Sequence, residues 1–578
     1  MADCSMAIAN NGNVINLNGQ PWSGRWLRQS VQGQPKFYVQ EDWLTQGLGV
    51  QMLDSDNADR QRVRWFSAPV FSQVAFDRTG RYRYLELSPF AELWRTEVVG
   101  NTLNLYTPDT KIQALRRSKQ PWGDRLVIDL DRRTPWRVSQ QANLISLIVS
   151  AEVAADLPLG TDAIAGNLIK SVTIQPQGKM TQIQIQTTES INPAIELLSS
   201  PNPKIVLDLR RDYTPPDLTI QWAKGLKRIE RTVEIPNQTT VPNTPTTVKF
   251  AVTALEVDLK QPQLTMRPIW SNPSGAGVLG LLPLPQMAEQ AEAVAAINAG
   301  FFNRIRQLPV GAIRQGNRWI AGTALVRGAI AWNESGEVLI DRLNFNEAIT
   351  VSNQTTINLT NLNSGYVQRG IARYTPSWGS TYSPLTENEI LIVVRGEQVV
   401  AQYQGGAVGV GQVTIPSDGY LLVARQTPNA IAQLPVGAIV RGRQSFVPKT
   451  FANFPNLIGA GPLLLKNSKT VLDGKIENFQ AGFDTQPAPR SAIATTKTQG
   501  KLLLTTIQAI PNGTAPNLAQ TAEVLKKLGA VDALNLDGGS SSSIYLGGNL
   551  LNRAITQIAP VHNAIAIFIT PPTPQPQF

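Results

Sequence analysis

The sequence of 578 residues contains one cysteine, Cys4, and one histidine, His562. A single cysteine excludes an intrachain disulfide and a cysteine-based zinc site. A single imidazole excludes a multi-histidine metal site and leaves His562 as the only residue for a histidine-dependent triad. An enzyme of this composition must rely on carboxylates, arginines, amides, hydroxyls and backbone N–H groups. Such groups suit glycoside or phosphate-ester chemistry better than redox or thiol chemistry.

Charge is also scarce. Charged residues make up 16% of the chain, against about 25% in an average domain. Hydrophobic residues make up 42%, which is enough for several buried cores and excludes a chain that is disordered throughout. The net charge of +10 is modest for this length. It favours acidic partners such as anionic glycans or phosphate esters, and nucleic acid is not predicted as a partner.

No apolar run reaches the roughly 18 residues of a membrane-spanning helix, so no transmembrane segment is predicted. Residues 1–9 lack both the basic start and the apolar core of a signal peptide. Two alternatives therefore stay open: a cytoplasmic protein, or a start that is truncated or misassigned. The length predicts three or four domains.

Residues 1–96 are typical of short strands with one helix. Arg60, Arg62 and Arg64 alternate, as do Arg81 and Arg83, so each set would share one face of a strand. Such a face is either solvated or a cationic strip for an anionic polymer. The region resembles the copper amine oxidase N-terminal-like module of envelope proteins. No copper is implied, because histidine and cysteine ligands are lacking.

Residues 97–212 are β-rich. Residues 125–130 and 204–209 have nearly the same strand pattern, and residues 181–187 alternate polar and apolar side chains as half-buried strands do. The stretch is similar to AMIN-type modules, small β-sandwiches that target enzymes to the cell envelope. The resemblance implies a periplasmic or extracellular protein that binds anionic cell-wall polysaccharide through its N-terminal modules.

The remaining chain divides into a linker, a large unit and a tail. Residues 213–247 are rich in Pro, Thr and Asn and predict a linker, and residues 571–578 predict a disordered tail. Residues 248–570 predict an α+β domain with mainly antiparallel sheets and few helices. Helices are expected near residues 284–294 and 517–528. Each precedes an apolar strand ending in Asn and Gly, which suggests two related halves with Asn298 and Asn535 at comparable positions.

The most informative segment is residues 535–541, Asn-Leu-Asp-Gly-Gly-Ser-Ser. An apolar strand delivers Asp537 to a turn, where Gly538 and Gly539 allow positive φ and close approach of a ligand. The N–H groups and the hydroxyls of Ser540 and Ser541 then become candidates for holding phosphate or sugar oxygens. An isolated Asp-Gly-Gly is more often an ordinary turn, so its significance depends on the other motifs.

Two further motifs carry polar groups of the same kind. In residues 297–303, Ile-Asn-Ala-Gly-Phe-Phe-Asn, the amides of Asn298 and Asn303 flank the Gly300 turn and suit sugar hydroxyls. Arg490, which precedes Ser491, could grip a phosphate in bidentate fashion. Alone, each would be read as a core strand with a turn or as a surface arginine. His562 is either a satisfied structural histidine or a site-lining residue.

Together these motifs resemble the phosphodiester glycosidase family over residues 248–570. The resemblance rests on residues 297–303, 309–311, 458–462, 490–492, 533–541 and 563–564 in this order. Ala299 stands where the family usually has Gly, Ser491 where it has Thr, and Ala494 where it has Gly. Ser491 keeps the hydroxyl, whereas Ala494 limits how closely a ligand can approach that strand.

The resemblance implies hydrolysis of a sugar–phosphate glycosidic bond, with an N-acetylglucosamine-type sugar, to give free sugar and a phosphomonoester. Asp537 is the candidate for activating water or shielding an oxocarbenium-like transition state. Arg490 would stabilise charge on the phosphate, and Asp484 is a candidate for a second carboxylate. The predicted substrate-binding residues are Asn298, Gly300, Asn303, Ser491, Asn535, Gly538, Gly539, Ser540, Ser541 and His562.

Two other functions stay open. One is a non-catalytic protein that binds envelope polysaccharide or peptidoglycan, and the other is a phosphoesterase that cleaves the P–O bond on the other side of the ester. No cofactor is predicted with certainty. Asp, Asn and carbonyl oxygens are ligands that Ca²⁺ accepts, but no Ca²⁺-binding loop is recognisable.

Overall fold

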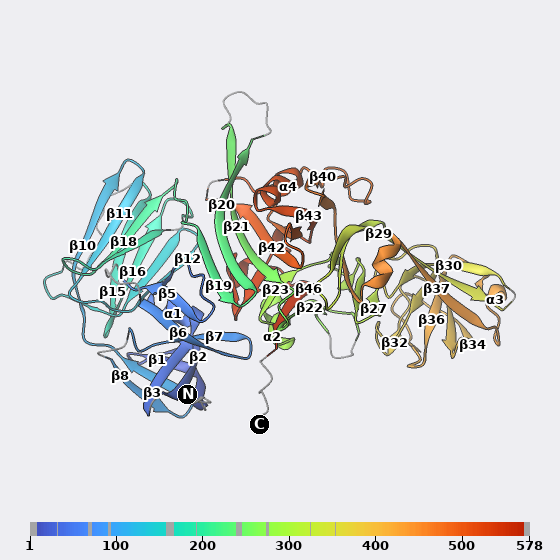
Figure 1. The fold of residues 1–578 in the computed structure, drawn as a ribbon, viewed down its shortest axis with the longest axis horizontal. Coiled ribbons are helices and arrows are strands. Elements are labelled where there is room, and N and C mark those ends of the chain that lie inside the picture. Colours follow the sequence, from blue (N-terminus) through green and yellow to red (C-terminus); the bar gives the residue numbers. More distant parts are fainter. Residues whose placement is uncertain are drawn as a thin grey trace. The chain divides into compact units, whose positions relative to one another are not determined.

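A computed structural model describes residues 8–31, 33–66, 72–90, 94–157, 167–191, 193–237, 245–272, 277–323, 325–352, 354–511 and 513–570. Cys4, the predicted tail and residues 238–244 of the predicted linker lie outside this part of the chain. The chain forms two compact units (Figure 1). The first is Met1–Thr232 with Ile510–Gly513, and the second is Val233–Ala509 with Thr514–Phe578.

The fold is richer in strands than the predicted α+β class. Strands make up 52% of the structure, and only four α-helices occur among the described residues. The predicted antiparallel sheets and scarcity of helices are confirmed. The difference arises because residues with helical periodicity form only short segments: the longest helix, α4 (Leu518–Lys527), has 10 residues.

The first unit begins with a sheet around helix α1 (Glu41–Leu48). Its described strands, in sheet order, are β4 (Gln51–Met52), β5 (Arg60–Arg64), β6 (Ser72–Thr79), β7 (Tyr82–Glu86), β3 (Gln34–Gln40), β2 (Gln20–Val31), β1 (Ile8–Leu17), β9 (Thr102–Tyr106) and β8 (Arg95–Val99). The core contains Trp26, Trp43 and Leu44. Arg83 is buried and pairs with Glu41 at 2.6 Å. The expected solvated or cationic face therefore does not include Arg83, because a carboxylate from α1 draws its guanidinium inward.

Two more sheets of the first unit pack on one shared core, to which Ile128 and Ile183 contribute. One sheet contains β14 (Glu152–Val153), β10 (Lys111–Gln120), β11 (Gly123–Leu130), β18 (Lys204–Arg210) and β17 (Ala194–Leu198). The other contains β12 (Trp136–Gln141), β13 (Leu144–Val149), β16 (Met180–Thr187) and β15 (Ile169–Gln177). The alternation predicted at residues 181–187 is found in β16, where Ile183 and Ile185 are buried.

The segment expected as a linker is largely strand. It contains β19 (Leu218–Ala223) and β20 (Leu226–Pro236), an antiparallel pair. Apolar side chains such as Ile220 and Trp222 are buried there. Pro and Thr dominate the composition of the segment, but its shorter apolar stretches have enough hydrophobic surface to join a core.

The second unit has two sheets that carry the predicted motifs. In one, the strand order is β21 (Thr247–Asp258), β42 (Lys501–Ala509), β41 (Arg490–Thr496), β43 (Ala530–Asn535), β39 (Leu463–Lys466) and β40 (Lys469–Thr470). In the other, it is β22 (Leu264–Trp270), β46 (Asn563–Ile569), β23 (Ala295–Asn298), β44 (Ile544–Leu546) and β45 (Asn549–Leu550). The chain crosses from β43 in the first sheet to β44 in the second.

Each sheet carries one of the predicted helices (Figure 1). Helix α4 packs its buried residues, including Leu518 and Leu525, on the first sheet. Asn517 caps it: the Asn517 side chain accepts from the Gln520 N–H, and the Gln520 side chain accepts in return from the Asn517 N–H. Helix α2 (Leu284–Gln290) packs on the second sheet.

A lobe of strands completes the second unit. Its sheet contains β27 (Arg318–Ala321), β26 (Ile313–Gln315), β38 (Asn456–Gly459), β28 (Arg327–Trp332), β29 (Val338–Val351), β30 (Thr356–Leu362), β31 (Gly370–Tyr374), β36 (Gly419–Arg425), β33 (Ile390–Arg395), β34 (Gln398–Gln404) and, paired with β29, β37 (Val440–Val447). Smaller elements are β24 (Phe302–Asn303), β25 (Leu308–Pro309), β32 (Thr381–Tyr382), β35 (Val413–Thr414) and α3 (Ala430–Gln433).

Candidate active site

Asp537 lies on the turn where the chain crosses between the two sheets. Its backbone N–H donates to the Ala299 carbonyl at 2.8 Å, and the Gly539 N–H donates to the Pro489 carbonyl at 2.7 Å. A Cβ at position 538 would lie 2.8 Å from the Pro489 carbonyl oxygen, and Gly539 has a φ of +63°. Both glycines are therefore required by the geometry of the turn itself.

The Asn298 side chain is fully buried and connects the predicted motifs. Its Nδ2 donates to the Asp537 carbonyl at 2.6 Å. Its Oδ1 accepts from the Ser491 hydroxyl at 2.7 Å and from the Ser543 N–H at 3.0 Å. The Ser491 hydroxyl also lies 3.0 Å from that of Ser542. The Asn298 amide thereby joins three segments that are distant in the chain. Its Nδ2 only donates and its Oδ1 only accepts, so all three contacts require the same orientation of the amide.

His562 is fully buried and supports the Gly300 turn through Asn563. The Asn563 Oδ1 accepts from the Gly300 N–H at 2.7 Å, and its Nδ2 lies 3.3 Å from the His562 Nδ1. The His562 Nε2 lies 2.6 Å from the Val278 carbonyl. An amide donor facing Nδ1 and a carbonyl facing Nε2 place the imidazole proton on Nε2. His562 thus holds a positioning role here, with no surface available to a ligand.

The Asp537 carboxyl is partly buried, and its pKa is perturbed. Burial raises the pKa to about 6, while the Ser541 hydroxyl, the Arg304 guanidinium and the Gly538 N–H act in the opposite direction. The guanidinium of Arg304 also donates to the Ser540 hydroxyl at 3.1 Å. A carboxyl group that titrates near neutral pH is suited to acid–base or nucleophilic work.

Arg304 is the cation that sequence reasoning missed. It is exposed, whereas Arg490 is 3% exposed. Its only signal was its place directly after Asn303. The Asn303 Oδ1 accepts from the N–H groups of Ile305 and Arg306 at 3.0 and 2.9 Å, which shapes the loop that presents Arg304.

The Arg490 side chain lies beside the turn, because its Cδ is 3.7 Å from the place of a Cβ on Gly538. It donates to the carbonyls of Gln486 and Pro516, and its Cζ lies 5.7 Å from the centre of the Phe483 ring. Burial lowers its pKa to about 10, and the charge of Asp484 opposes that shift. These contacts hold the guanidinium of Arg490 against the loop that leads into β41.

Asp484 and Asn535 likewise organise backbone. The Asp484 Oδ2 accepts from the Gly474 N–H at 3.0 Å, and the Asn535 Nδ2 donates to the Gly461 carbonyl at 2.8 Å. Within the described residues, no second carboxylate shares a hydrogen bond with Asp537. The same part of the chain contains no cluster of three or more His, Cys, Asp or Glu side chains that could hold a metal.

The N–H groups of the glycine turn are mostly used within the protein. Those of Ser541 and Ser542 donate to the carbonyls of Gly538 and Gly539, and that of Ser543 donates to Asn298. The expected anion grip by consecutive backbone N–H groups is therefore largely taken up by internal bonds. Arg304 and Ser540 are exposed, and the Arg304 guanidinium donates to the Ser540 hydroxyl beside Asp537.

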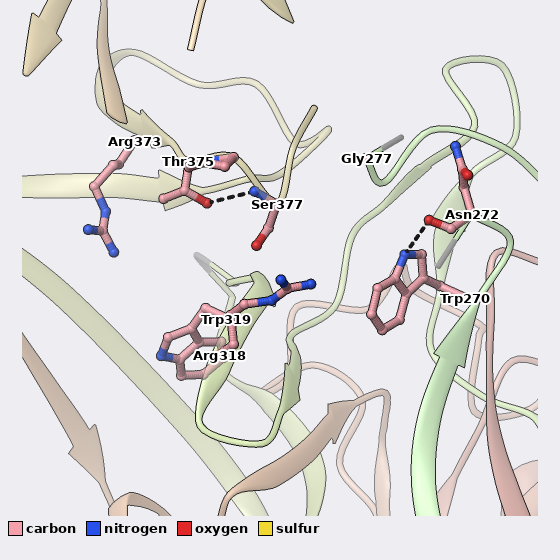
Figure 2. A pocket seen from close by; sticks show the side chains of 9 residues that line it. Trp270, Asn272, Gly277, Arg318, Trp319, Arg373, Thr375 and Ser377 are labelled. Carbon is pink, nitrogen blue, oxygen red and sulfur yellow. Dashed lines mark hydrogen bonds between the residues drawn. The ribbon is translucent and has the colours of Figure 1, made fainter. Parts of the chain in front are cut away.

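A cavity of about 470 Å³ lies elsewhere in the second unit, outside the predicted residues (Figure 2). Trp270, Arg318, Trp319 and Arg373 contribute to its walls, and Arg318 extends between Trp270 and Ser377 in Figure 2. The pairing of β22 with β46 puts Trp270 opposite Asn563.

The fold and the site define a β-rich protein with one perturbed carboxyl on a glycine turn beside an exposed arginine. Residues 388–568 match the model of the phosphodiester glycosidase family. This part of the chain is a domain of that family. The motif at residues 297–303 lies outside the matched range, yet Asn298 from that motif holds the Asp537 turn.

Solved structures give further similarities. The crystal structure of a hypothetical protein from Synechocystis is 34% identical, with a TM-score of 0.85 over 97% of this chain and 100% of that one. A putative exported protein from Burkholderia pseudomallei is 16% identical, with a TM-score of 0.46 over 79% and 97% of the two chains. The zebrafish N-acetylglucosamine-1-phosphodiester alpha-N-acetylglucosaminidase catalytic domain, auto-inhibited by its pro-peptide, is 15% identical, with a TM-score of 0.31 over 60% and 84%. A comparison with curated proteins found no match. No helix among the described residues is long and apolar enough to span a membrane.

Proposed function

We propose that the second unit is a hydrolase that cleaves the bond between the anomeric carbon of a sugar and a phosphodiester oxygen. The products would be free sugar and a phosphomonoester. The observation that carries the proposal is the Asp537 carboxyl, whose pKa is raised to about 6 on a rigid turn beside Arg304. The match of residues 388–568 to the phosphodiester glycosidase family supports the reaction class.

The reaction needs little help at the leaving group. A phosphate ester leaves with its negative charge spread over its oxygens, so it requires less protonation than an alcohol. Arg304 and the Ser540 hydroxyl are placed to bind those oxygens. The ionised Asp537 would activate water or stabilise positive charge on the sugar ring. Asn298 would act as a positioning residue through the Asp537 carbonyl.

The proposed substrate is an N-acetylglucosamine-type sugar linked through phosphate in an envelope or extracellular glycan. The sugar follows from the family resemblance, and the location follows from the resemblance of the N-terminal modules. Cell fractionation tests the location: recovery of the protein only with cytoplasmic markers would contradict it.

The test compares wild type, Asp537→Asn and Asp418→Asn on a methyl phosphodiester of N-acetylglucosamine 1-phosphate. The exposed Asp418 pairs loosely with Arg395 at 3.8 Å and serves as the matched control. We expect free N-acetylglucosamine from wild type and control, and a loss of at least about 100-fold in Asp537→Asn. Because the carboxylate form is the active one, kcat/KM should rise with pH through about 6.

Other outcomes assign other functions. Undiminished turnover by Asp537→Asn would remove this residue from catalysis. Release of sugar phosphate would indicate cleavage of the P–O bond. An absence of product together with saturable binding of envelope polysaccharide would favour a binding protein.

A further inference from the structure

The loop at residues 303–308 connects the candidate active site to a second cavity of about 470 Å³. Arg304 contacts Ser540 beside Asp537, and Arg306 lines the cavity. Residues two apart in the chain are separated by at most about 7 Å between their Cα atoms. One short stretch of loop therefore joins the place proposed for the phosphate to the cavity.

This cavity, which we call the Val408 groove, is apolar with a cationic side. Its lining includes Leu279, Leu308, Trp378, Leu385, Val408 and Arg306, with hydroxyls from Ser380, Thr381 and Ser383. Leu279 is 57% exposed and Val408 54%, and Ile305, between Arg304 and Arg306, is 95% exposed. Large apolar side chains gathered at one exposed place mark a surface for an apolar ligand.

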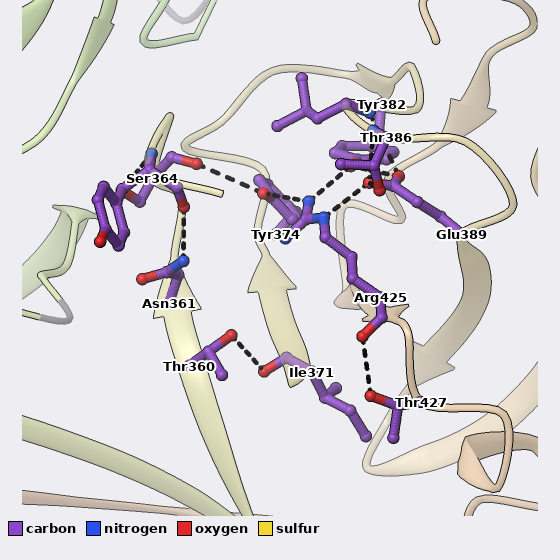
Figure 3. Close-up of polar contacts among 12 residues, drawn as sticks. Thr360, Asn361, Ser364, Ile371, Tyr374, Tyr382, Thr386, Glu389, Arg425 and Thr427 are labelled. Atoms are coloured by element: carbon purple, nitrogen blue, oxygen red, sulfur yellow. Dashed lines mark hydrogen bonds and ion pairs between the residues drawn. The ribbon is translucent and has the colours of Figure 1, made fainter. Parts of the chain in front are cut away.

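A buried polar network holds one wall of the groove in place (Figure 3). The Arg425 Nε pairs with Glu389 at 2.6 Å, and its Nη2 donates to the hydroxyls of Tyr374 and Tyr382 at 2.8 Å each. Glu389 accepts from the Thr386 N–H at 2.9 Å and from the Tyr382 hydroxyl at 2.7 Å.

The network bears directly on the groove-lining residues. The Trp378 ring lies 4.7 Å from that of Tyr374, and the Leu385 N–H donates to Glu389 at 3.3 Å. Tyr382 itself is buried between them. A wall fixed by buried charged hydrogen bonds is preformed, as ligand sites usually are.

We propose that the Val408 groove binds an apolar group esterified to the substrate phosphate, so that the substrate is a sugar 1-phosphate diester of a hydrophobic alcohol. The inference rests on the proposed function. Arg304 and Arg306 complement the anionic phosphate, and the apolar lining complements the chain that leaves it. A second glycan would leave Leu279 and Val408 without a matching partner.

The experiment compares the methyl and octyl phosphodiesters of N-acetylglucosamine 1-phosphate in the full chain. Wild type should favour the octyl ester in kcat/KM, by up to about fourfold for each methylene that the groove buries. Leu279→Ser and Val408→Ser should reduce the octyl-to-methyl ratio toward one. Val436→Ser, which changes a 61% exposed valine outside the groove, is the matched control and should keep the wild-type ratio.

The outcomes separate this inference from the proposed function. Equal kcat/KM for both esters in wild type overturns the groove assignment and leaves the hydrolase intact. If neither ester is cleaved, the proposed function fails, and calorimetry with octyl phosphate decides the groove. Binding of octyl phosphate to wild type that is abolished in Val408→Ser supports the groove assignment. An absence of binding to wild type overturns it. A dimer that Val408→Ser dissociates and octyl phosphate does not would assign the groove to a second copy, which also overturns the proposal.

Discussion

At the scale of single residues, the buried polar side chains that surround Asp537 form hydrogen bonds within the protein and are shielded from solvent. Asn298, Ser491 and Asn563 are buried, and each has donors and acceptors matched to its neighbours. Buried amides without partners would be costly, so satisfied ones fix a single arrangement. Asp537 keeps its raised pKa because this framework holds its backbone in a partly buried place.

His562 gives a residue-scale prediction, since it is the only imidazole of the chain. Burial lowers its pKa to about 4, although its bond to the Val278 carbonyl opposes the shift. As the pH falls, the imidazole of the unfolded chain is protonated before that of the folded protein, at about pH 6.5. The contribution of neutral His562 to the free energy of unfolding is therefore fully present above about pH 6.5. About 3 kcal/mol of it is lost as the pH falls toward 4.

NMR of histidine-labelled protein checks this. We expect one imidazole signal with a midpoint near pH 4 and the proton on Nε2. The urea-unfolded chain is the control and should titrate near 6.5. A folded-state midpoint near 6.5 would contradict the buried position of the ring.

At the scale of elements, the site depends on strands that approach closely through glycines. The Gly459 carbonyl, at the end of β38, lies 2.7 Å from the place of a Cβ on Gly300 and 2.4 Å from one on Gly311. Backbone atoms on both sides cannot move aside as a flexible side chain could. The approach of β38 to the Gly300 turn therefore requires these small residues.

Gly300→Ala is predicted to destabilise the protein by about 1 to 3 kcal/mol. It should also lower kcat/KM more than tenfold, because the new methyl group would lie 3.2 Å from the Asn563 Oδ1 and displace it. Thermal unfolding and hydrolysis assays measure the two effects. Gly442→Ala, in β37 with open space around its Cβ position, is the control. Equal unfolding temperatures and equal kcat/KM values for the two variants would contradict the close approach of β38 to the Gly300 turn.

At the scale of the whole molecule, the chain has two units with separate cores. The Glu41–Arg83 ion pair is buried in the first unit, and the Trp222 indole N–H also donates to Glu41 at 3.1 Å. Removing one partner of a buried pair leaves an uncompensated charge, which costs about 3 to 5 kcal/mol.

Arg83→Ala is therefore predicted to shift the unfolding of the first unit to lower urea concentration. The NMR signal of folded His562, which reports on the second unit, should persist at urea concentrations above that transition. Arg95→Ala is the control, because Arg95 is exposed and lies 3.8 Å from Glu97; such pairs contribute at most about 1 kcal/mol. Loss of the His562 signal together with the first unit would show that the two unfold as one.

Patterns that repeat along the chain were predictable. The helices expected near residues 284–294 and 517–528 are found as α2 and α4, and the alternation at residues 181–187 is found in β16. The linker prediction for residues 213–247 erred because Pro and Thr outweighed the apolar alternation of β19 and β20. Overall composition describes a segment less well than the pattern of its few buried residues.

The sequence by itself determined the chemistry that is available and the likeness of residues 388–568 to the phosphodiester glycosidase family. It predicted a site at Asp537 and its glycine turn, because turn residues and motif order are local properties. Only the tertiary structure decided which charged groups stay outside. It buried Arg490 and His562, left Arg304 beside Asp537, and paired Arg83 with Glu41. Burial and charge pairing depend on segments far apart in the chain, and spacing along one strand carries no record of them.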